Sequence, residues 1–278
     1  MLTFVKYLLS ECKHKVLQDT VFLYIFLIIV SYLIGSVSSS IILGRYFYGI
    51  DVRQFGSHNP GANNTQRVLG WKMGLTVFIF DLLKGVVAVQ LARLLPFDHE
   101  TNPYVASQIV LGLSAILGHI FPLFHNFKGG KGVSTLVGVL LAIHPFAVLL
   151  CLIIFLIVFV FTRYISVSVI AAVTCFPFMV NFIFALWLQP EETLTLKIFS
   201  IVVGVIIWLT HLSNLKRLYY GKEEKFSIKP AVGPYAFYAS KKNQNNNIHN
   251  VYRCVEIEIK MANARLAKSF NTGAYCSM

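Results

Sequence analysis

Two short stretches of this chain combine glycines with basic, hydroxyl and amide side chains, although the sequence around them is apolar. One is GSHNPGANNTQR, residues 56–67, and the other is FKGGKGVST, residues 127–135. Glycines let consecutive backbone N–H groups turn inward around an anion, and the polar side chains add donors. Both stretches therefore indicate a site for phosphate. The alternatives are an ordinary Pro60-Gly61 turn in the first and, in the second, a basic turn attracted to lipid headgroups.

The second stretch is not a nucleotide-binding P-loop, because Lys131 is followed by Gly132 and not by Ser or Thr. Lys131 nevertheless supplies a compact positive charge that suits a phosphate group. For this stretch alone, the anion site and the lipid-facing turn are equally well supported.

Further polar residues interrupt the apolar segments. Asp81 and Lys84 are spaced i, i+3, so they share one face of a helix as a functional pair or a structural ion pair. His119 suits a packing role better than a catalytic one. His211 fits either a substrate contact or a cap at a helix C-terminus. We find no paired carboxylates, metal-ligand cluster or nucleophile elbow, so we expect catalysis by positioning and electrostatics, without cofactor or metal.

The elements that must position these residues are membrane helices. The chain has 278 residues, a mean hydropathy of +0.67, 56% hydrophobic and only 13% charged residues, against about 25% charged in soluble domains. The net charge of +12 lies largely in short loops and the tail, without a nucleic-acid-binding motif, so nucleic acid is not expected as a partner. Seven apolar segments predict spans, near residues 21–46, 74–95, 105–125, 133–143, 146–161, 167–188 and 193–211.

The charge of the loops decides between seven spans and six. Pro145 separates the fourth segment from the fifth, although the two could form one kinked helix. Arg53, Lys131 and Arg163 all lie in loops on one side only if there are seven spans. We therefore predict an all-α integral membrane protein with seven transmembrane helices, the N-terminus outside and the C-terminus cytoplasmic. We divide it into an N-terminal extension (1–20), a seven-span domain (21–229) and a polar, partly disordered cytoplasmic tail (230–278).

Several polar motifs follow one another along the chain: Ser36 near the end of the first span, YGIDVRQFGSHNPGANNTQRVLG, FDLLKG, GHIFPLFHNFKGGKGVST, RYIS and HLSNLKRL. In their order and spacing they resemble the bacterial acyl-phosphate:glycerol-3-phosphate acyltransferases. The resemblance covers about residues 21–229. It implies transfer of a fatty acyl group from acyl phosphate to the 1-hydroxyl of glycerol 3-phosphate, giving lysophosphatidic acid and phosphate, the first acylation of phospholipid synthesis. It also implies a place in the bacterial inner membrane with the site facing the cytoplasm, and as partners membrane lipids and the soluble enzyme that makes acyl phosphate.

The resemblance also implies roles for individual residues. Lys131, Ser36, Arg45 and His211 are the expected catalytic residues. The expected substrate-binding residues are Gly56, Ser57, Asn59, Gly61, Asn64, Gly129, Gly130, Gly132, Ser166 and Asn214. Of these, Arg45 and Lys131 would bind anionic groups, residues 56–61 would hold the donor phosphate, and Ser36, Ser166, His211 and Asn214 would place glycerol 3-phosphate.

Three residues depart from the family pattern. His58 replaces a glycine, Asn63 replaces the usual Thr, and Val169 stands where a second Ser is common. His58 and Val169 keep open the alternative of a family member that binds lipid phosphate without turnover. The rival from another class is a transporter of phosphate or organic anions. It is disfavoured because the polar loops gather on one side.

Overall fold

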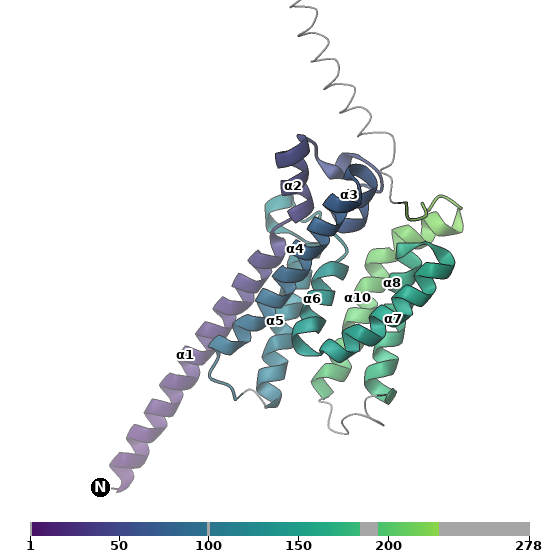
Figure 1. Ribbon diagram of the computed structural model, residues 1–278. Helices are drawn as coiled ribbons and strands as arrows, with labels where there is room; N and C mark the ends of the chain where they lie inside the picture. Colours follow the sequence, from purple (N-terminus) through teal and green to yellow (C-terminus); the bar gives the residue numbers. More distant parts are fainter. Residues whose placement is uncertain (1, 99–100, 184–193, 228–278) are drawn as a thin grey trace, which may run out of the picture. The chain divides into compact units, whose positions relative to one another are not determined.

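The computed structural model describes residues 2–98, 101–183 and 194–227, and these residues are helical apart from short connections (Figure 1). The predicted tail, residues 230–278, lies outside the described residues. The helices are α1 (Leu2–Ser36), α2 (Ser39–Tyr48), η1 (Val52–Gln54), α3 (Ala62–Leu69), α4 (Trp71–Gln90), η2 (Leu91–Leu94), α5 (Asn102–Ile120), η3 (Leu123–His125), α6 (Val133–Ile143), α7 (Pro145–Thr162), α8 (Ile165–Phe178), η4 (Met179–Ile183) and α10 (Leu194–Tyr219).

Five helical stretches are long and apolar enough to cross a membrane. They are Gln18–Tyr48, Trp71–Leu94, Asn102–His125, Pro145–Thr162 and Leu194–Tyr219. Two further apolar helices, Val133–Ile143 and Ile165–Asn181, are shorter and coincide with the fourth and sixth predicted spans. The all-helical, membrane-spanning class is therefore confirmed for the described residues, and the count of seven stays a prediction.

The structure adds two features to the predicted N-terminal region. Helix α1 runs without interruption through residue 20, where the extension was expected to give way to the first span. No proline or glycine stands between residues 2 and 34 to interrupt it. The predicted span of 21–46 lies within the apolar stretch Gln18–Tyr48, but the helix is interrupted inside it: α1 ends at Ser36 and α2 begins at Ser39.

Polar groups from α4 stabilise this break inside the apolar bundle. Lys84 Nζ donates to the carbonyl oxygen of Val37 at 3.0 Å and forms an ion pair with Asp81 Oδ1 at 2.9 Å. Ser39 Oγ donates to the same carboxylate oxygen at 2.8 Å. At a helix end, backbone N–H and C=O groups have no hydrogen-bond partner within the helix. They must find partners elsewhere in the protein, because the hydrocarbon of a membrane offers none. The predicted Asp81–Lys84 pair therefore exists, and it joins α4 to the α1–α2 break.

The turn at Pro145 separates two helices, as the sequence predicts. Helix α6 ends at Ile143 and α7 begins at Pro145, the position where a helix tolerates the missing N–H of proline. The ring of His144 caps α7, since its Nδ1 accepts from the N–H of Ala147 at 3.2 Å.

Two helix crossings are close because each helix contributes a glycine. At the α1–α5 crossing, a Cβ added to Gly35 would collide with the carbonyl of Ala115, and one added to Gly118 with that of Tyr32. At the α4–α6 crossing, Gly85 and Gly138 lie in the same way against carbonyls of the facing helix. Small residues let membrane helices approach closely enough for strong van der Waals contact. These crossings bring the ends of α1, α4, α5 and α6 together.

The ion pair at the helix break gives a stability prediction. Replacing Lys84 by Met should lower the free energy of unfolding by about 3 to 5 kcal/mol, because it leaves the buried Asp81 carboxylate without its cation. Thermal unfolding of the purified protein in detergent measures the loss. Adding Asp81→Asn to Lys84→Met should restore part of it, and the same change at exposed Lys72 of α4 should have little effect. Equal stability of Lys84→Met and the wild type would contradict the role given to the pair.

Candidate active site

A cavity of about 510 Å³ lies among α3, α4, α6, α7, α8 and α10, with polar residues at one end and apolar side chains along the rest. Gly61 lines it together with polar residues that include Ser57, Asn59, Asn64, His119, Lys131, Ser166, His211 and Asn214. Apart from His119, these residues come from the four loop regions that were predicted to lie on one side of the bundle. The structure therefore places most of the predicted site residues around one cavity.

Asn214 of α10 connects three of these regions. Its Oδ1 accepts from Lys131 Nζ, and its Nδ2 donates to Ser166 Oγ and, at 3.1 Å, to Glu223 Oε1. The amide is 3% exposed, so its orientation is fixed by these partners and not by water. The result is a chain of polar contacts from the glycine-rich loop before α6 to the start of α8.

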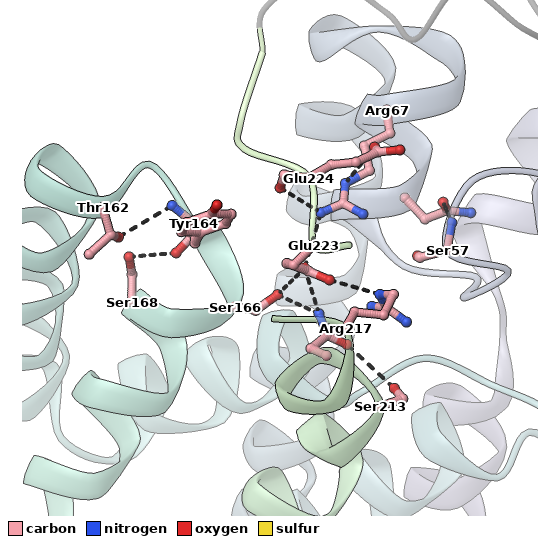
Figure 2. Close-up of polar contacts among 12 residues, drawn as sticks. Ser57, Arg67, Thr162, Tyr164, Ser166, Ser168, Ser213, Arg217, Glu223 and Glu224 are labelled. Carbon is pink, nitrogen blue, oxygen red and sulfur yellow. Dashed lines mark hydrogen bonds and ion pairs between the residues drawn. The ribbon is translucent and has the colours of Figure 1, made fainter. Parts of the chain in front are cut away.

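Glu223, which follows α10, is the residue that the sequence analysis missed. Its buried carboxylate accepts from Ser166 Oγ at 2.8 Å and from Arg217 Nε at 2.8 Å, and it lies 3.2 Å from Arg67 Nη2 (Figure 2). Burial raises the pKa of Glu223, but the hydrogen bonds from Ser166 and Arg217 and the charges of Arg67 and Arg217 outweigh it. The pKa lies below its usual range, so the group is ionised at neutral pH. A buried, ionised carboxylate therefore contacts the predicted site residues Ser166 and Asn214, at a position that the sequence did not indicate.

Lys131 has an unusual electrostatic environment. Burial lowers its pKa to about 7, and the charges of Arg217 and Arg67 act in the same direction, whereas Glu223 opposes them. An ammonium whose pKa is close to neutral is easily stabilised by an arriving anion, because that anion supplies the missing opposite charge.

The loop before α3 owes its shape to Asn64. The Asn64 side chain is buried, its Nδ2 donates to the carbonyls of Val52 at 2.8 Å and Phe55 at 3.1 Å, and its Oδ1 accepts from Ser57 N at 2.7 Å. Three of its four hydrogen-bonding positions thus serve the loop itself. Gly56 has a φ of 60° and faces the same amide, so a Cβ there would collide with it. Asn64 accordingly shapes the loop, and it also lines the cavity beside Ser57 and Asn59.

His58, which replaces the family glycine, adopts the left-handed backbone conformation with a φ of 59°. A residue other than glycine pays about 1–2 kcal/mol for that conformation. Its Nδ1 lies 2.9 Å from the carbonyl oxygen of Arg53, and the ring lines a second, polar hollow together with Lys128 and Gly129. His58 is therefore accommodated at the glycine position, and its side chain is not among those that line the main cavity.

The glycines of the second loop pack against α5. The N–H groups of Gly129 and Gly130 donate to the carbonyls of Ile120 at 3.1 Å and His119 at 3.0 Å. A Cβ at Gly130 would collide with the His119 ring, so only glycine permits this approach. Gly132 has a φ of 82° and begins α6. The expected inward nest of N–H groups is therefore not formed by Gly129 and Gly130, whose role here is to place Lys131.

His211 lies at the cavity and two other predicted catalytic residues do not line it. His211 Nδ1 is 2.8 Å from the carbonyl oxygen of Ile207, which makes this nitrogen the N–H donor of the neutral ring and leaves Nε2 as an acceptor. Ser36 is buried, and its Oγ donates to the carbonyl of Tyr32 at 2.8 Å. Arg45, with a side chain that is 59% exposed, forms an ion pair with Asp51 at 2.8 Å.

Within the parts of the chain that the structure describes, no three His, Cys, Asp or Glu side chains are grouped so that they could hold a metal ion. The polar end of the cavity instead carries Lys131, with Arg67 and Arg217 close behind it. Such a site is suited to an anionic ligand with an apolar part.

The chain matches the family model described as glycerol-3-phosphate acyltransferase over residues 25–221. It is 40% identical over 227 residues to a glycerol-3-phosphate acyltransferase of Chlorobium phaeobacteroides (strain BS1), which covers 73% of this chain and 97% of the relative. It is 38% identical to the corresponding protein of Chlorobaculum tepidum, over 73% and 96% of the two chains.

Two solved structures share the fold. Both are of PlsY (YgiH), described as an integral membrane glycerol 3-phosphate acyltransferase, in a glycerol 3-phosphate form and a lysophosphatidic acid form. Their TM-scores are 0.65 and 0.61 at 33% identity, and the alignments cover 73% and 74% of this chain and 96% of each structure. This chain therefore belongs to the glycerol-3-phosphate acyltransferase family of the PlsY type.

Proposed function

We propose that this protein transfers a fatty acyl group from acyl phosphate to the 1-hydroxyl of glycerol 3-phosphate, giving lysophosphatidic acid and inorganic phosphate. The observation that carries the proposal is the single cavity in which a cationic, hydrogen-bonding end is joined to an apolar body among membrane helices. A lipid donor with a phosphate at its head needs both parts. The glycerol 3-phosphate and lysophosphatidic acid forms of the related structures support this choice of acceptor and product.

Lys131 is the proposed partner of the anionic groups, together with Ser57, Asn59 and Gly61 at the start of α3. Bound there, the acyl phosphate would have its carbonyl carbon close to Ser166, Asn214 and His211. The glycerol hydroxyl attacks that carbon, a new ester bond forms, and the bond to the phosphate oxygen breaks. Acyl phosphate is already activated, so donors fixed at the leaving phosphate supply most of the catalysis.

The proton of the attacking hydroxyl needs an acceptor. Glu223 is held by Arg67, Arg217, Ser166 and Asn214, and its lowered pKa makes it a weak base. We therefore assign the proton to the phosphate of the substrate itself. His211 is assigned to orient the hydroxyl, because its Nε2 is the ring nitrogen left without the Ile207 contact.

Arg45 keeps its proposed part on a condition set by the geometry, whereas for Ser36 we propose a structural part in place of a substrate contact. Arg45 must leave Asp51 to bind a substrate phosphate, and its side chain is 59% exposed in the ion pair. Ser36 lies one turn beyond Tyr32 on α1, so it acts by fixing the helix break that carries α2.

We further propose seven spans, an external N-terminus and a cytoplasmic site in the bacterial inner membrane. Lys131 and Ser166 both contact Asn214, so the chain returns to the same end between them, which supports separate passages for α6 and α7. Several of the exposed aromatic residues stand at or next to the ends of the helices that border the polar loops, as expected at a membrane–water interface: Tyr46, Phe47, Trp71, Phe124, Phe161, Tyr219 and Tyr220. The catalytic domain is proposed to be residues 21–229, and the soluble enzyme that makes acyl phosphate is a proposed partner.

The purified full-length protein in lipid vesicles tests the proposal. With glycerol 3-phosphate and acyl phosphate we expect lysophosphatidic acid and one equivalent of phosphate, and with acyl-CoA in place of acyl phosphate we expect no product. Mass spectrometry and phosphate release measure both. No product from either donor would overturn the proposal, and uptake of phosphate by the same vesicles would favour transport.

A further inference from the structure

The apolar body of the cavity extends away from the polar residues, between three helices. Its walls are residues of α6, α7 and α8: Val133, Leu136, Val137, Leu140, Val148, Cys151, Phe155, Val169, Ala172, Val173 and Phe176. On α8, the lining residues run from Ser166 at the polar end to Phe176, ten residues later. At a rise of 1.5 Å per residue this is about 15 Å of helix. The cavity is thus long enough to hold a substantial part of an alkyl chain.

The far end of this body is closed. Leu140 in the last turn of α6 is 5% exposed, and Phe176 near the end of α8 is 2% exposed. Val148 adds to them from the first turn of α7. All three belong to, or pack on, one cluster of apolar side chains. An alkyl chain that reaches this floor cannot extend further without displacing close-packed side chains, which costs free energy.

The cavity also has a side toward the membrane-facing surface. Leu75 of α4 and Leu152 of α7 both line it, and they are 48% and 47% exposed. This side is where a lipid chain would enter from the bilayer. An acyl chain could therefore run along the cavity to its closed end, the floor, or leave through the side toward the bilayer. The two paths differ in how activity depends on the length of the chain. Only the floor makes the enzyme sensitive to chain length.

We infer that Phe176, with Leu140 and Val148, forms a floor that sets the acyl-chain length accepted by the enzyme. The inference rests on the proposed function, since it concerns the acyl group of that donor. Ala172 stands one turn above Phe176 on the same wall, so its small side chain leaves the passage to the floor open. Each methylene that fits is worth about fourfold in binding, from ~0.8 kcal/mol per buried methylene. Each one too many loses that gain and adds a steric cost.

A competition experiment with the full-length protein in vesicles tests the floor. The enzyme receives glycerol 3-phosphate and an equimolar mixture of saturated acyl phosphates whose lengths bracket the preferred one. The lysophosphatidic acids are then resolved by mass spectrometry. Phe176→Leu should shift the product distribution toward longer chains, and Ala172→Leu should shift it toward shorter ones. For each variant we expect the ratio of neighbouring lengths to change by about fourfold or more per methylene.

Ala171→Leu is the matched control, because Ala171 precedes Ala172 on α8 but does not line the cavity. It should leave the distribution unchanged. Thermal unfolding in detergent shows whether each variant is folded, and Ala172→Leu keeps the test valid if Phe176→Leu is not. Wild-type distributions in both folded variants would overturn the floor and favour the side course. No product from the wild type with any chain would instead overturn the proposed function.

Discussion

Replacing Lys131 by alanine should reduce turnover by about a hundred- to a thousandfold while leaving the protein folded in the membrane. The expected size follows from removing one preorganised charge at the position where the leaving phosphate develops its own. Lys131 is linked to Ser166 through Asn214, and it lines the polar end of the cavity. The variant is measured by release of phosphate from acyl phosphate in the presence of glycerol 3-phosphate.

Lys128 provides the matched control, because it lies three residues earlier in the same loop but is exposed and lines the second hollow. Lys128→Ala should keep turnover close to that of the wild type, since it removes the same charge without touching the main cavity. If Lys128→Ala lost as much activity as Lys131→Ala, the loop would act through its total charge and the specific role of Lys131 would be wrong. A fully active Lys131→Ala protein would be equally contradictory.

The pH profile gives a second measurement of the same residue. Because burial lowers the pKa of Lys131 to about 7, the ammonium form dominates below that pH and is lost as the pH rises through it. If the charged form binds the substrate, kcat/KM should fall on the alkaline side, since this parameter reports the free enzyme. Besides burial, the groups that set the position of the fall are Arg217 of α10, Glu223 and Arg67 of α3. Residual activity of Lys131→Arg should lack this fall, because arginine stays protonated.

The general architecture was predictable because it depends on features that hold along whole segments. Hydropathy and loop charge indicated the helices, and they placed residues 56–67, 127–132, 163–168 and 211–217 at one side of the bundle. One cavity is indeed lined by residues from these regions, namely Lys131, Ser166, His211 and Asn214, although Lys131 and Asn214 are 83 positions apart in the sequence. Long polar loops next to apolar spans can be recognised in the sequence without knowing any individual contact.

The details that were missed depend on which of several equivalent partners a group contacts. Asn64 and Asn59 look alike in the sequence, and only the structure shows that the side-chain amide of Asn64 donates to the carbonyls of Val52 and Phe55. The break after Ser36 depends on Lys84, which is 47 positions away from the carbonyl that it contacts. Such choices are decided by distances of a few ångström between helices, and the pattern along one chain does not contain them.

Glu223 was missed for a related reason. It follows the last span in GKEEKF, where two adjacent acidic residues near Lys216 and Arg217 suggest only a solvated, mixed-charge end. Glu224 fits that description, with a side chain that is 58% exposed, whereas the side chain of Glu223 is 1% exposed. A buried acid among several cations could have been suspected from the excess of basic residues on this side, since buried charge needs a counter-ion. The sequence did not indicate which of the two glutamates it would be.

Glu223→Ala should therefore lose much of its stability, by about 3 to 5 kcal/mol in the free energy of unfolding. The variant leaves the guanidinium groups of Arg67 and Arg217 near each other without the carboxylate that joins them, and it removes an acceptor from Ser166 and Asn214 (Figure 2). Thermal unfolding in detergent and the yield of inserted protein measure the loss. Glu224→Ala is the control, because its exposed carboxylate contributes little.

Glu223→Gln separates the charge of this residue from its shape. Glutamine keeps an oxygen that can accept from Ser166 and Asn214, so it should be more stable than Glu223→Ala and less stable than the wild type. Because Glu223 is the group that raises the pKa of Lys131, its neutralisation should also move the alkaline fall of kcat/KM to lower pH. A purely structural role would change stability without moving that fall. If the fall stayed in place in a folded Glu223→Gln protein, Glu223 would stabilise the end of α10 without tuning Lys131.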